Sequence, residues 1–273
     1  MKAKQLLAEL LSAGYAQTIS AHEVVGDIAI VNLPAKLLHL ADLIGQAILA
    51  SNKRIKVVAR RDGQYAGEYR TVPLVIIAGE QRKETEHREF GIRLRLNPEK
   101  VYFSPRSGGE RRRIAGLVQP DEDVLVLFSG IGPYPLIISA HSKARTIVGI
   151  EKNPLAHGYA LANLALNRKC ANVSLRCGDV LTLLPTLSRL FDRIVMPLPG
   201  DGDIFLAGAL AVLRPGGHLH FYDFQPPQSF AQSIARLDLA CQEIGRSLSR
   251  AEVRSCGHCA PHLYRVCVDG EIA

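Results

Sequence analysis

The sequence contains no apolar run long enough to cross a lipid bilayer, and its first residues lack the basic, apolar and small-residue pattern of a signal peptide. We therefore expect a cytoplasmic protein with no membrane partner. The six cysteines are too scattered along 273 residues to indicate a disulfide framework. What is present, 47% hydrophobic and 22% charged residues, is typical of a soluble globular chain that is long enough for two domains.

Positive charge is concentrated in the front part of the chain. Residues 1–119 contain 19 Lys and Arg against 12 Asp and Glu, whereas residues 120–273 contain 14 of each kind. Such an asymmetry favours a polyanion, most simply a nucleic acid, as the partner of the first domain. The alternative is a basic balance that serves solubility alone.

The segment Val124–Tyr134 (VLVLFSGIGPY) joins an apolar run to a glycine turn, which is the pattern of a buried strand that ends beside a ligand. A second apolar run, Thr146–Ile150, ends on Glu151, whose carboxylate can accept hydrogen bonds from both ribose hydroxyls. Farther along, Gly178-Asp179 supplies an acidic loop for adenine. The glycine turn lacks the third glycine of a dinucleotide site and contains two prolines, so S-adenosylmethionine is favoured. The alternative is an ordinary α/β domain whose strands end in Gly and Asp.

Hydrophobic periodicity divides the chain into a small α+β domain, residues 1–115, and a class I (Rossmann-like) α/β domain, residues 116–273. In the first domain we expect helices over 1–14 and 34–50 and strands over 24–33, 55–60, 71–78, 90–96 and 100–103, the first of them entered from a turn at Gly26-Asp27. In the second we expect strands over 146–150, 173–177, 192–196 and 218–223, helices over 153–167 and 227–246, and an antiparallel pair over 251–256 and 263–268. With the strand of the glycine turn, this pattern predicts a mostly parallel seven-stranded sheet with helices on both faces.

The bridge between the two domains contains Glu110 in the sequence Gly108-Gly109-Glu110-Arg111-Arg112-Arg113. One interpretation makes Glu110 an acid that the helix dipole favours in a first turn, with the arginines as a solvated face. The other places its carboxylate at a cleft between a basic domain and a cofactor domain. The residues alone leave both interpretations open.

Five motifs run along residues 22–270: VGDIAI (25–30), GEYR (67–70), HREFG (87–91), KVYFSPR followed by GER (100–106 and 109–111), and FSGIGP (128–133). Together they resemble the archaeal and eukaryotic tRNA guanosine-37 N1-methyltransferases. The related aminocarboxypropyl transferases of the wybutosine pathway share much of this framework. The resemblance implies a methyl transfer from S-adenosylmethionine to N1 of the guanosine next to the anticodon, with the tRNA anticodon arm as partner. A monomer is the working expectation.

The resemblance also implies roles for individual residues. Arg70 would hold the guanine O6 and stabilise negative charge there, and Glu110 would be the general base for the N1 proton. Tyr102 would form a wall of the base pocket. Further contacts to the base fall on Arg106, Pro197, Leu198 and Pro199, and contacts to the cofactor fall on Phe128, Gly130, Gly132, Pro133, Glu151, Lys152, Asp179 and Val180.

Three departures from the family pattern bear on function. Pro197 replaces an asparagine that contacts the target base, and Val126 stands where an acidic residue is common. The first 22 residues hold no counterpart of the family's separate N-terminal domain, so we expect recognition through the anticodon arm or through a partner. Two alternatives therefore stay open: aminocarboxypropyl transfer to a tricyclic base at the same tRNA position, and a tRNA-binding homologue with weak turnover.

The motif Cys256-Gly257-His258-Cys259, with His262 nearby, offers metal-ligating side chains. It has no second pair at zinc-finger spacing, and a loop between two strands would hold the ligands loosely. We therefore expect no metal.

Overall fold

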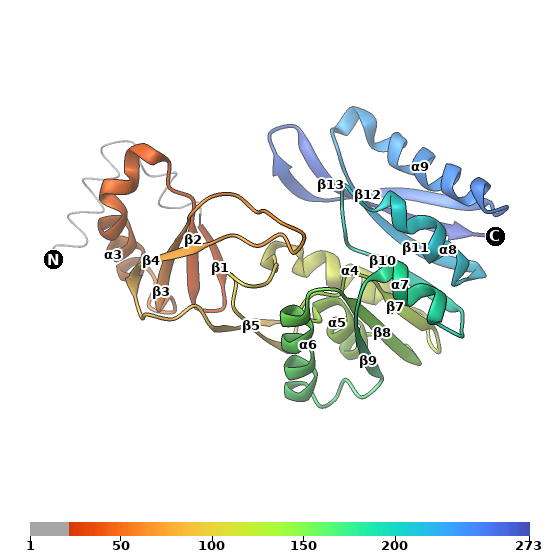
Figure 1. The fold of residues 1–273 in the computed structure, drawn as a ribbon, viewed down its shortest axis with the longest axis horizontal. Helices are drawn as coiled ribbons and strands as arrows, with labels where there is room; N and C mark the ends of the chain where they lie inside the picture. Colours follow the sequence, from red (N-terminus) through yellow and green to blue (C-terminus); the bar gives the residue numbers. More distant parts are fainter. Residues whose placement is uncertain (1–21) are drawn as a thin grey trace. The chain divides into compact units, whose positions relative to one another are not determined.

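The computed structural model describes residues 22–273 (Figure 1). Its contacts divide the chain into two compact units, and the boundary along the sequence lies between Pro105 and Arg106. The helix expected over residues 1–14 lies outside the described residues. The division falls ten residues before the expected boundary at 115, because α4 (Gly108–Leu117) packs against α5 (Pro133–His141) of the second unit. Among the described residues no helix is long and apolar enough to cross a membrane.

The first unit contains a four-stranded sheet in the order β1-β2-β3-β4, in which only β2 and β3 are parallel. Its strands are β1 (His22–Val25), β2 (Ile28–Val31), β3 (Val57–Arg61) and β4 (Leu74–Gly79). The 3-10 helix η1 (Ala35–Leu40) leads into α3 (Ala41–Ser51), which packs against β3 and β4. The contact buries Ile44, Ala47 and Ile48, which recur at helical spacing.

One strand expectation for the first unit is wrong, and another is confirmed only in part. The turn expected at Gly26-Asp27 is present and leads into β2; Gly26 adopts a φ of 60° there, and a Cβ would lie 2.1 Å from the Thr85 hydroxyl. The residues before the turn form the additional strand β1, so the segment is a hairpin. The pair expected over 90–96 and 100–103 is instead β5 (Thr85–Glu89) with β6 (Ile92–Leu96). Charged residues hid β5 from the hydrophobic pattern, but Glu86 accepts a 2.7 Å hydrogen bond from Arg93 across the hairpin. This bond lowers the pKa of Glu86 to about 2.

The second unit contains the expected seven-stranded sheet, in the order β12-β13-β11-β10-β7-β8-β9. Strands β11, β10, β7, β8 and β9 are parallel, and β13 pairs antiparallel with both β11 and β12. The strands are β7 (Asp123–Val126), β8 (Thr146–Glu151), β9 (Val173–Cys177), β10 (Phe191–Met196), β11 (Leu213–Gln225), β12 (Leu248–Ala260) and β13 (Leu263–Ile272). The prediction of a mostly parallel sheet is therefore confirmed.

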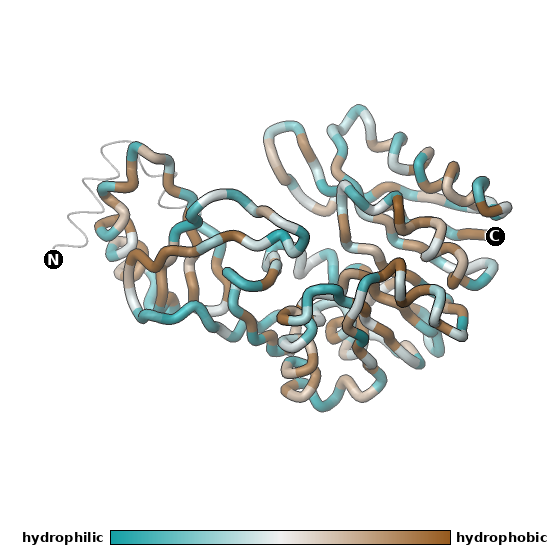
Figure 2. The backbone as a smooth tube through the Cα atoms, in the orientation of Figure 1, coloured by the Kyte–Doolittle hydropathy of each residue, from teal (hydrophilic) through white to brown (hydrophobic). Residues whose placement is uncertain are grey.

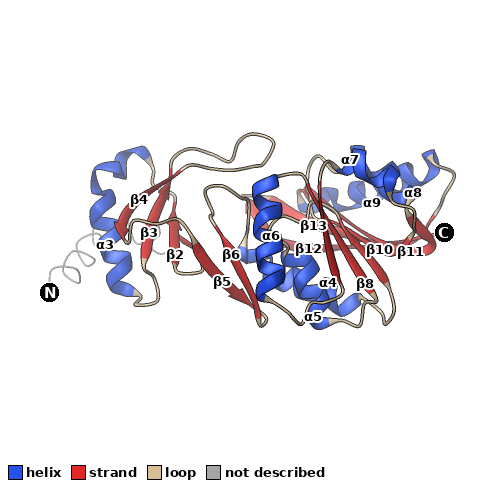
Figure 3. Ribbon diagram, turned by 60° about the horizontal axis from the view of Figure 1, so that its bottom comes forward, coloured by secondary structure: helices blue, strands red, loops and turns tan. Residues whose placement is uncertain are grey.

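Helices cover both faces of this sheet (Figure 3). On one face lie α4, α5 and α6 (Pro154–Leu166); on the other lie α7 (Val180–Leu183), α8 (Leu206–Ala211) and α9 (Phe230–Glu243). Short 3-10 helices complete the unit: η2 (Pro105–Ser107), η3 (Leu184–Thr186), η4 (Asp203–Phe205) and η5 (Pro227–Ser229). The central strands carry the hydrophobic colour in Figure 2, as expected for strands buried on both faces. Parallel strands end at a common edge, so the loops after β7, β8, β9 and β10 lie together there.

Candidate active site

Glu151, the last residue of β8, is held in one orientation by two backbone amides. Its Oε2 accepts a 2.7 Å hydrogen bond from Gly130, and its Oε1 accepts a 2.7 Å bond from Asn153. Burial raises the pKa of Glu151, and these backbone bonds oppose that effect. A carboxylate has about four acceptor positions, so two remain for the hydroxyls of a ribose. The structure thus joins two of the residues that the sequence assigned to the cofactor.

The two glycine amides of the turn after β7 are engaged in hydrogen bonds within the protein. The amide of Gly130 binds Glu151, the amide of Gly132 donates to the Ser129 carbonyl at 3.0 Å, and Pro133 has no N–H at the start of α5. Gly130 and Gly132 have φ angles of 57° and 88°, which glycine adopts without strain. Because a pyrophosphate site needs amides that face the ligand, this turn fits an adenosine ligand without phosphates better than a dinucleotide.

Residues that follow the neighbouring strands complete this edge. Lys152 forms a 2.6 Å ion pair with Asp179, which lowers the pKa of Asp179 and connects the loop after β8 to the loop after β9. Asp179 is also the N-cap of α7, where it accepts from Leu181 at 2.8 Å, and Val180 is buried in the core below it. At the end of β7, the ring of Phe128 packs edge-on against Phe205, with ring centroids 4.8 Å apart. All the proposed cofactor residues therefore lie around one edge of the sheet.

The segment Pro197–Pro199 follows β10, which is the neighbour of β7, and so lies at the same edge. Leu198 donates a backbone hydrogen bond of 2.8 Å to Met196, which closes a tight turn directly after the strand. Pro197 and Leu198 are half-buried, and the segment presents backbone and apolar side chains with no amide side chain. Val126, in the adjacent strand, is fully buried and supplies no carboxylate, so the acidic contact to the ribose is assigned to Glu151.

Glu110 lies in the first turn of α4, buried at 9% exposure, and is the centre of a hydrogen-bond network. Arg113, one helical turn later, donates from Nε to Oε2 at 2.7 Å and from Nη2 to Oε1 at 2.8 Å. The Tyr222 hydroxyl donates to Oε1 at 2.6 Å and lies 3.1 Å from the hydroxyl of Tyr134. Tyr134 belongs to the first turn of α5, the helix that begins at the glycine turn. The network therefore holds the Glu110 carboxylate near the cofactor edge.

One acceptor position of Glu110 has only a weak donor. Arg113 and Tyr222 fill three of about four positions, and the thiol of Cys256 supplies a weak hydrogen bond in addition. Burial raises the pKa of Glu110, but the bonds from Arg113 and Tyr222 outweigh it, so the pKa lies below its ordinary value. The carboxylate is ionised at neutral pH and can accept one more proton donor if that donor displaces the thiol.

The network continues away from Glu110 through charged side chains. Arg113 also donates to Asp269, at 2.6 Å to Oδ2, and Asp269 lies 2.6 Å from His220 Nδ1. The other ring nitrogen of His220 lies 2.8 Å from Arg193 Nη1. Since Arg193 can only donate, His220 is neutral with its proton on Nδ1. Burial and Arg193 lower the pKa of His220, and the hydrogen bond that His220 donates to Asp269 opposes this effect.

This network contains three potential metal ligands, His220, Cys267 and Asp269, whose ligand atoms lie within 4.8 Å of one another. Two guanidinium groups, those of Arg113 and Arg193, already bind Asp269 and His220. They supply the positive charge that a metal ion would bring, so the cluster is described better as a buried ion-pair network.

In the first unit, the motif that contains Arg70 closes a tight hairpin between β3 and β4. Ala66 and Thr71 exchange two backbone hydrogen bonds, of 3.0 and 3.2 Å, around Gly67–Arg70, and Arg70 has a φ of 48°. A non-glycine residue in this left-handed conformation costs about 1–3 kcal/mol, which is a reason to consider a functional role. Arg70 lies in the first unit and Glu110 in the second.

Tyr102 is 48% exposed and packs edge-on against Tyr65, with ring centroids 5.6 Å apart. Tyr65 is 43% exposed and lies in the loop that also contains Arg70. Arg61 places its guanidinium 5.2 Å from the Tyr65 ring centroid and donates to the Tyr65 hydroxyl at 3.1 Å. Exposed aromatic rings beside a guanidinium group form the kind of surface on which unpaired nucleobases stack.

No motif in the sequence indicated that Tyr65, Tyr134, Tyr222 and Arg113 belong to these groups of side chains. The arginines after Glu110 are not a solvated face, because Arg111 is buried and Arg113 forms ion pairs. Helical spacing of Glu110 and Arg113 was a signal for their contact. No local signal connects either residue to Tyr222. Arg106, by contrast, is exposed and forms no hydrogen bond or ion pair with the described residues.

Comparison with known proteins gives two family matches. A family described as the TRM5/TYW2 methyltransferase domain matches residues 85–249, and one described as the TYW2 N-terminal domain matches residues 3–82. The chain is 34% identical to the tRNA (guanine(37)-N(1))-methyltransferase Trm5b of Pyrococcus abyssi, over 92% of this chain and 74% of the relative. A crystal structure of that enzyme superposes with a TM-score of 0.84 at 33% identity, covering 93% of this chain and 75% of that one.

Two further similarities concern substrates. The tRNA 4-demethylwyosine(37)-methyltransferase Taw21 of Saccharolobus solfataricus is 31% identical, over 90% of this chain and 92% of the relative. A structure described as the complex of aTrm5 and tRNALeu superposes with a TM-score of 0.83 at 29% identity, covering 97% of this chain and 77% of that chain.

Proposed function

The chain belongs to the TRM5/TYW2 methyltransferase family, and from this membership we propose that it transfers a methyl group from S-adenosylmethionine to N1 of guanosine 37 in a tRNA. The partner is the anticodon arm, and the reaction takes place in the cytoplasm. Residues 1–115 would face the RNA, in agreement with their excess of positive charge, and residues 116–273 would bind the methyl donor.

The observation that carries the proposal is the position and state of Glu110. Its carboxylate is ionised, buried and connected through Tyr222 and Tyr134 to the helix that begins at the glycine turn. N1 of guanine carries a proton that must leave as the methyl group arrives. An oriented carboxylate with one weakly occupied acceptor position supports a general base at this point.

In the proposed mechanism, Glu151 would accept hydrogen bonds from the ribose of the methyl donor, and the glycine turn would lie beside the donor's methionine side. S-adenosylmethionine supplies a methyl group on a sulfonium, a good leaving group for an in-line displacement. The N1–H of the guanine would displace the Cys256 thiol as a hydrogen-bond donor to Glu110, which would then accept the N1 proton. Arg113 and Tyr222 hold the carboxylate while this happens, so positioning supplies much of the acceleration.

Arg70 would stabilise the negative charge that develops on guanine O6 as the N1 proton leaves. Tyr102 would stack on the target base or on its neighbour, and Tyr65 would support Tyr102 from the side. Pro197, Leu198 and Pro199 would contact the base through shape and backbone, because this segment has no amide side chain. A single-stranded loop lets the target base leave its stack at low cost.

A second candidate function is transfer to a carbon atom of a tricyclic derivative of the same nucleoside. It is motivated by Pro197, which removes a side-chain contact to guanine, and by the similarity to Taw21. The transferred group would be a methyl group, or an aminocarboxypropyl group as in a 27% identical relative from Methanocaldococcus jannaschii named tRNA(Phe) (4-demethylwyosine(37)-C(7)) aminocarboxypropyltransferase.

The test is single-turnover transfer from labelled S-adenosylmethionine to an unmodified tRNA transcript with G at position 37, with an A37 transcript as control. Methyl label that requires G37 and falls by about 10²–10⁴-fold in Glu110→Gln would support the reaction and the base. A tRNA carrying 4-demethylwyosine, analysed by nucleoside mass, tests the second candidate. Label on that substrate alone would refute methylation of guanosine.

A further inference from the structure

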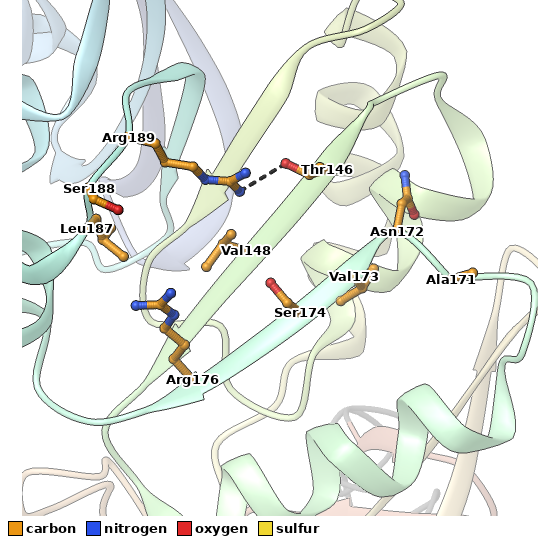
Figure 4. A pocket seen from close by; sticks show the side chains of 10 residues that line it. All are labelled: Thr146, Val148, Ala171, Asn172, Val173, Ser174, Arg176, Leu187, Ser188 and Arg189. Carbon is orange, nitrogen blue, oxygen red and sulfur yellow. Dashed lines mark hydrogen bonds between the residues drawn. The ribbon is translucent and has the colours of Figure 1, made fainter.

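A groove of about 460 Å³ opens on the second unit over the first residues of β8 and β9 (Figure 4). Val148 and Leu187 contribute apolar surface to it, and Arg176, Arg189 and Ser174 contribute polar groups. Thr146 lies at the start of β8, five residues or roughly 16 Å before Glu151 along the strand. At the other end of the groove, Arg176 of β9 pairs in register with Ile150, directly before the pair of Glu151 with Cys177. None of the residues that line the groove is among those assigned to the cofactor.

Two guanidinium groups face this groove. Figure 4 shows the side chain of Arg189 extending toward Thr146 and that of Arg176 toward Leu187, with Val148 between the two arginines and Ser174 on the same strand as Arg176. Arg189 is held in place by a 2.9 Å hydrogen bond to the Thr146 hydroxyl and lies over the ring of Phe191, 4.8 Å from its centroid. Arg176 forms no hydrogen bond or ion pair within residues 22–273, so all its donors are available.

Asp123, the carboxylate beside Arg189, and its neighbour Asp192 are already paired with other arginines. Arg145 and Arg214 form ion pairs with Asp123 and Asp192, the latter pair at 2.6 Å. Arg189 reaches Asp123 only at 4.0 Å, the limit of an ion pair. The positive charges of Arg176 and Arg189 are therefore available to bind an anion.

We propose that this groove binds a phosphate group of the tRNA backbone. The inference rests on the proposed function, because it takes the RNA substrate as given. Guanidinium groups match the geometry of phosphate oxygens, and a hydroxyl such as that of Ser174 is a common additional donor in phosphate contacts. Because the groove is open, the RNA backbone can continue on both sides of the bound phosphate. The groove contains none of the residues assigned to the methyl transfer, so the contact contributes affinity and orientation.

The experiment compares Arg176→Gln with Arg250→Gln, a matched loss of one charge at an exposed arginine on β12. The tRNA dissociation constant of each variant is measured at several salt concentrations. In Arg176→Gln we expect weaker binding at low salt and a log–log salt slope shallower by about 0.7–0.9, the value for one lost phosphate contact. Methyl transfer at saturating tRNA and affinity for S-adenosylhomocysteine should match the wild type.

Two results would overturn the proposal. One is a salt slope and tRNA affinity in Arg176→Gln equal to those of Arg250→Gln. The other is binding of AMP or inorganic phosphate that Arg176→Gln abolishes while tRNA binding stays intact, which would assign the groove to a free phosphate ligand. Failure of the wild-type protein to methylate tRNA would count against the proposed function instead, so the two failures are distinguishable.

Discussion

The hydrogen bond from Tyr222 to Glu110 predicts an unequal cost for two similar substitutions. Tyr222→Phe and Tyr134→Phe each remove one hydroxyl from a buried ring and leave the ring in place. The Tyr222 hydroxyl donates to a carboxylate at 2.6 Å, whereas the Tyr134 hydroxyl donates to a neutral phenol at 3.1 Å. A hydrogen bond to a charged group contributes about 1.5–3 kcal/mol and a neutral one about 0.5–1.5 kcal/mol.

We therefore expect Tyr222→Phe to lower the free energy of unfolding of the second unit by roughly 1 kcal/mol more than Tyr134→Phe does. Tyr222→Phe also leaves the Tyr134 hydroxyl without its partner, which adds to the difference. Urea titration at pH 7, followed by far-ultraviolet circular dichroism, measures both values. An equal or larger cost for Tyr134→Phe would refute the charge-assisted bond.

The difference in unfolding free energy between Tyr222→Phe and Tyr134→Phe should decrease at acidic pH. The pKa of Glu110 is lowered in the folded protein, so its stabilisation is present above the unfolded value of about 4.3 and is lost as the pH falls through the folded value. The gap between the two variants should narrow in that acidic range. In methyl transfer, Tyr222→Phe raises the pKa of the base, so the acidic limb of the pH–rate profile should move to higher pH. A stability difference that does not change with pH would contradict the charge-assisted bond to Glu110. An acidic limb that does not move in Tyr222→Phe would contradict Glu110 as the base.

Three further outcomes are expected. Glu151→Gln places an amide N–H against one of two backbone amides, at a cost of about 1–3 kcal/mol. The affinity for S-adenosylhomocysteine, measured by calorimetry, should therefore fall roughly five- to hundredfold. An unchanged affinity would show that Glu151 does not belong to the cofactor site. Tyr65→Ala should weaken tRNA binding in filter assays by a stacking contribution of about 1–3 kcal/mol, whereas Tyr65→Phe should retain it; equal losses would argue against stacking. His220, whose pKa is lowered, should stay neutral with the proton on Nδ1 below pH 6.5 in nitrogen-15 NMR spectra, and a titration near 6.5 would contradict this.

The sheet and the cofactor edge could be predicted from the sequence because their signals are local. An apolar run followed by glycine or an acid identifies a buried strand and the loop after it, and parallel strands bring such loops to one edge without further information. That is why the Gly130 turn and Glu151, 21 residues apart, were expected near each other and are in contact. Locality also explains what was missed: β1 before the Gly26 turn is only four residues long, and charged residues hide β5 from the hydrophobic pattern.

The surroundings of Glu110 were decided only by the tertiary structure. Its partner Tyr222 is 112 residues away, and Arg113 meets Asp269 across 156 residues. The sequence determined that an acid lies in a first helical turn, and a family resemblance suggested its role. Packing of α4 against β11 and β13 then determined burial, ionisation and the one weakly occupied acceptor position. Protonation energies depend on what lies within a few ångströms in space, and that neighbourhood is set by the folded packing of segments distant in the chain.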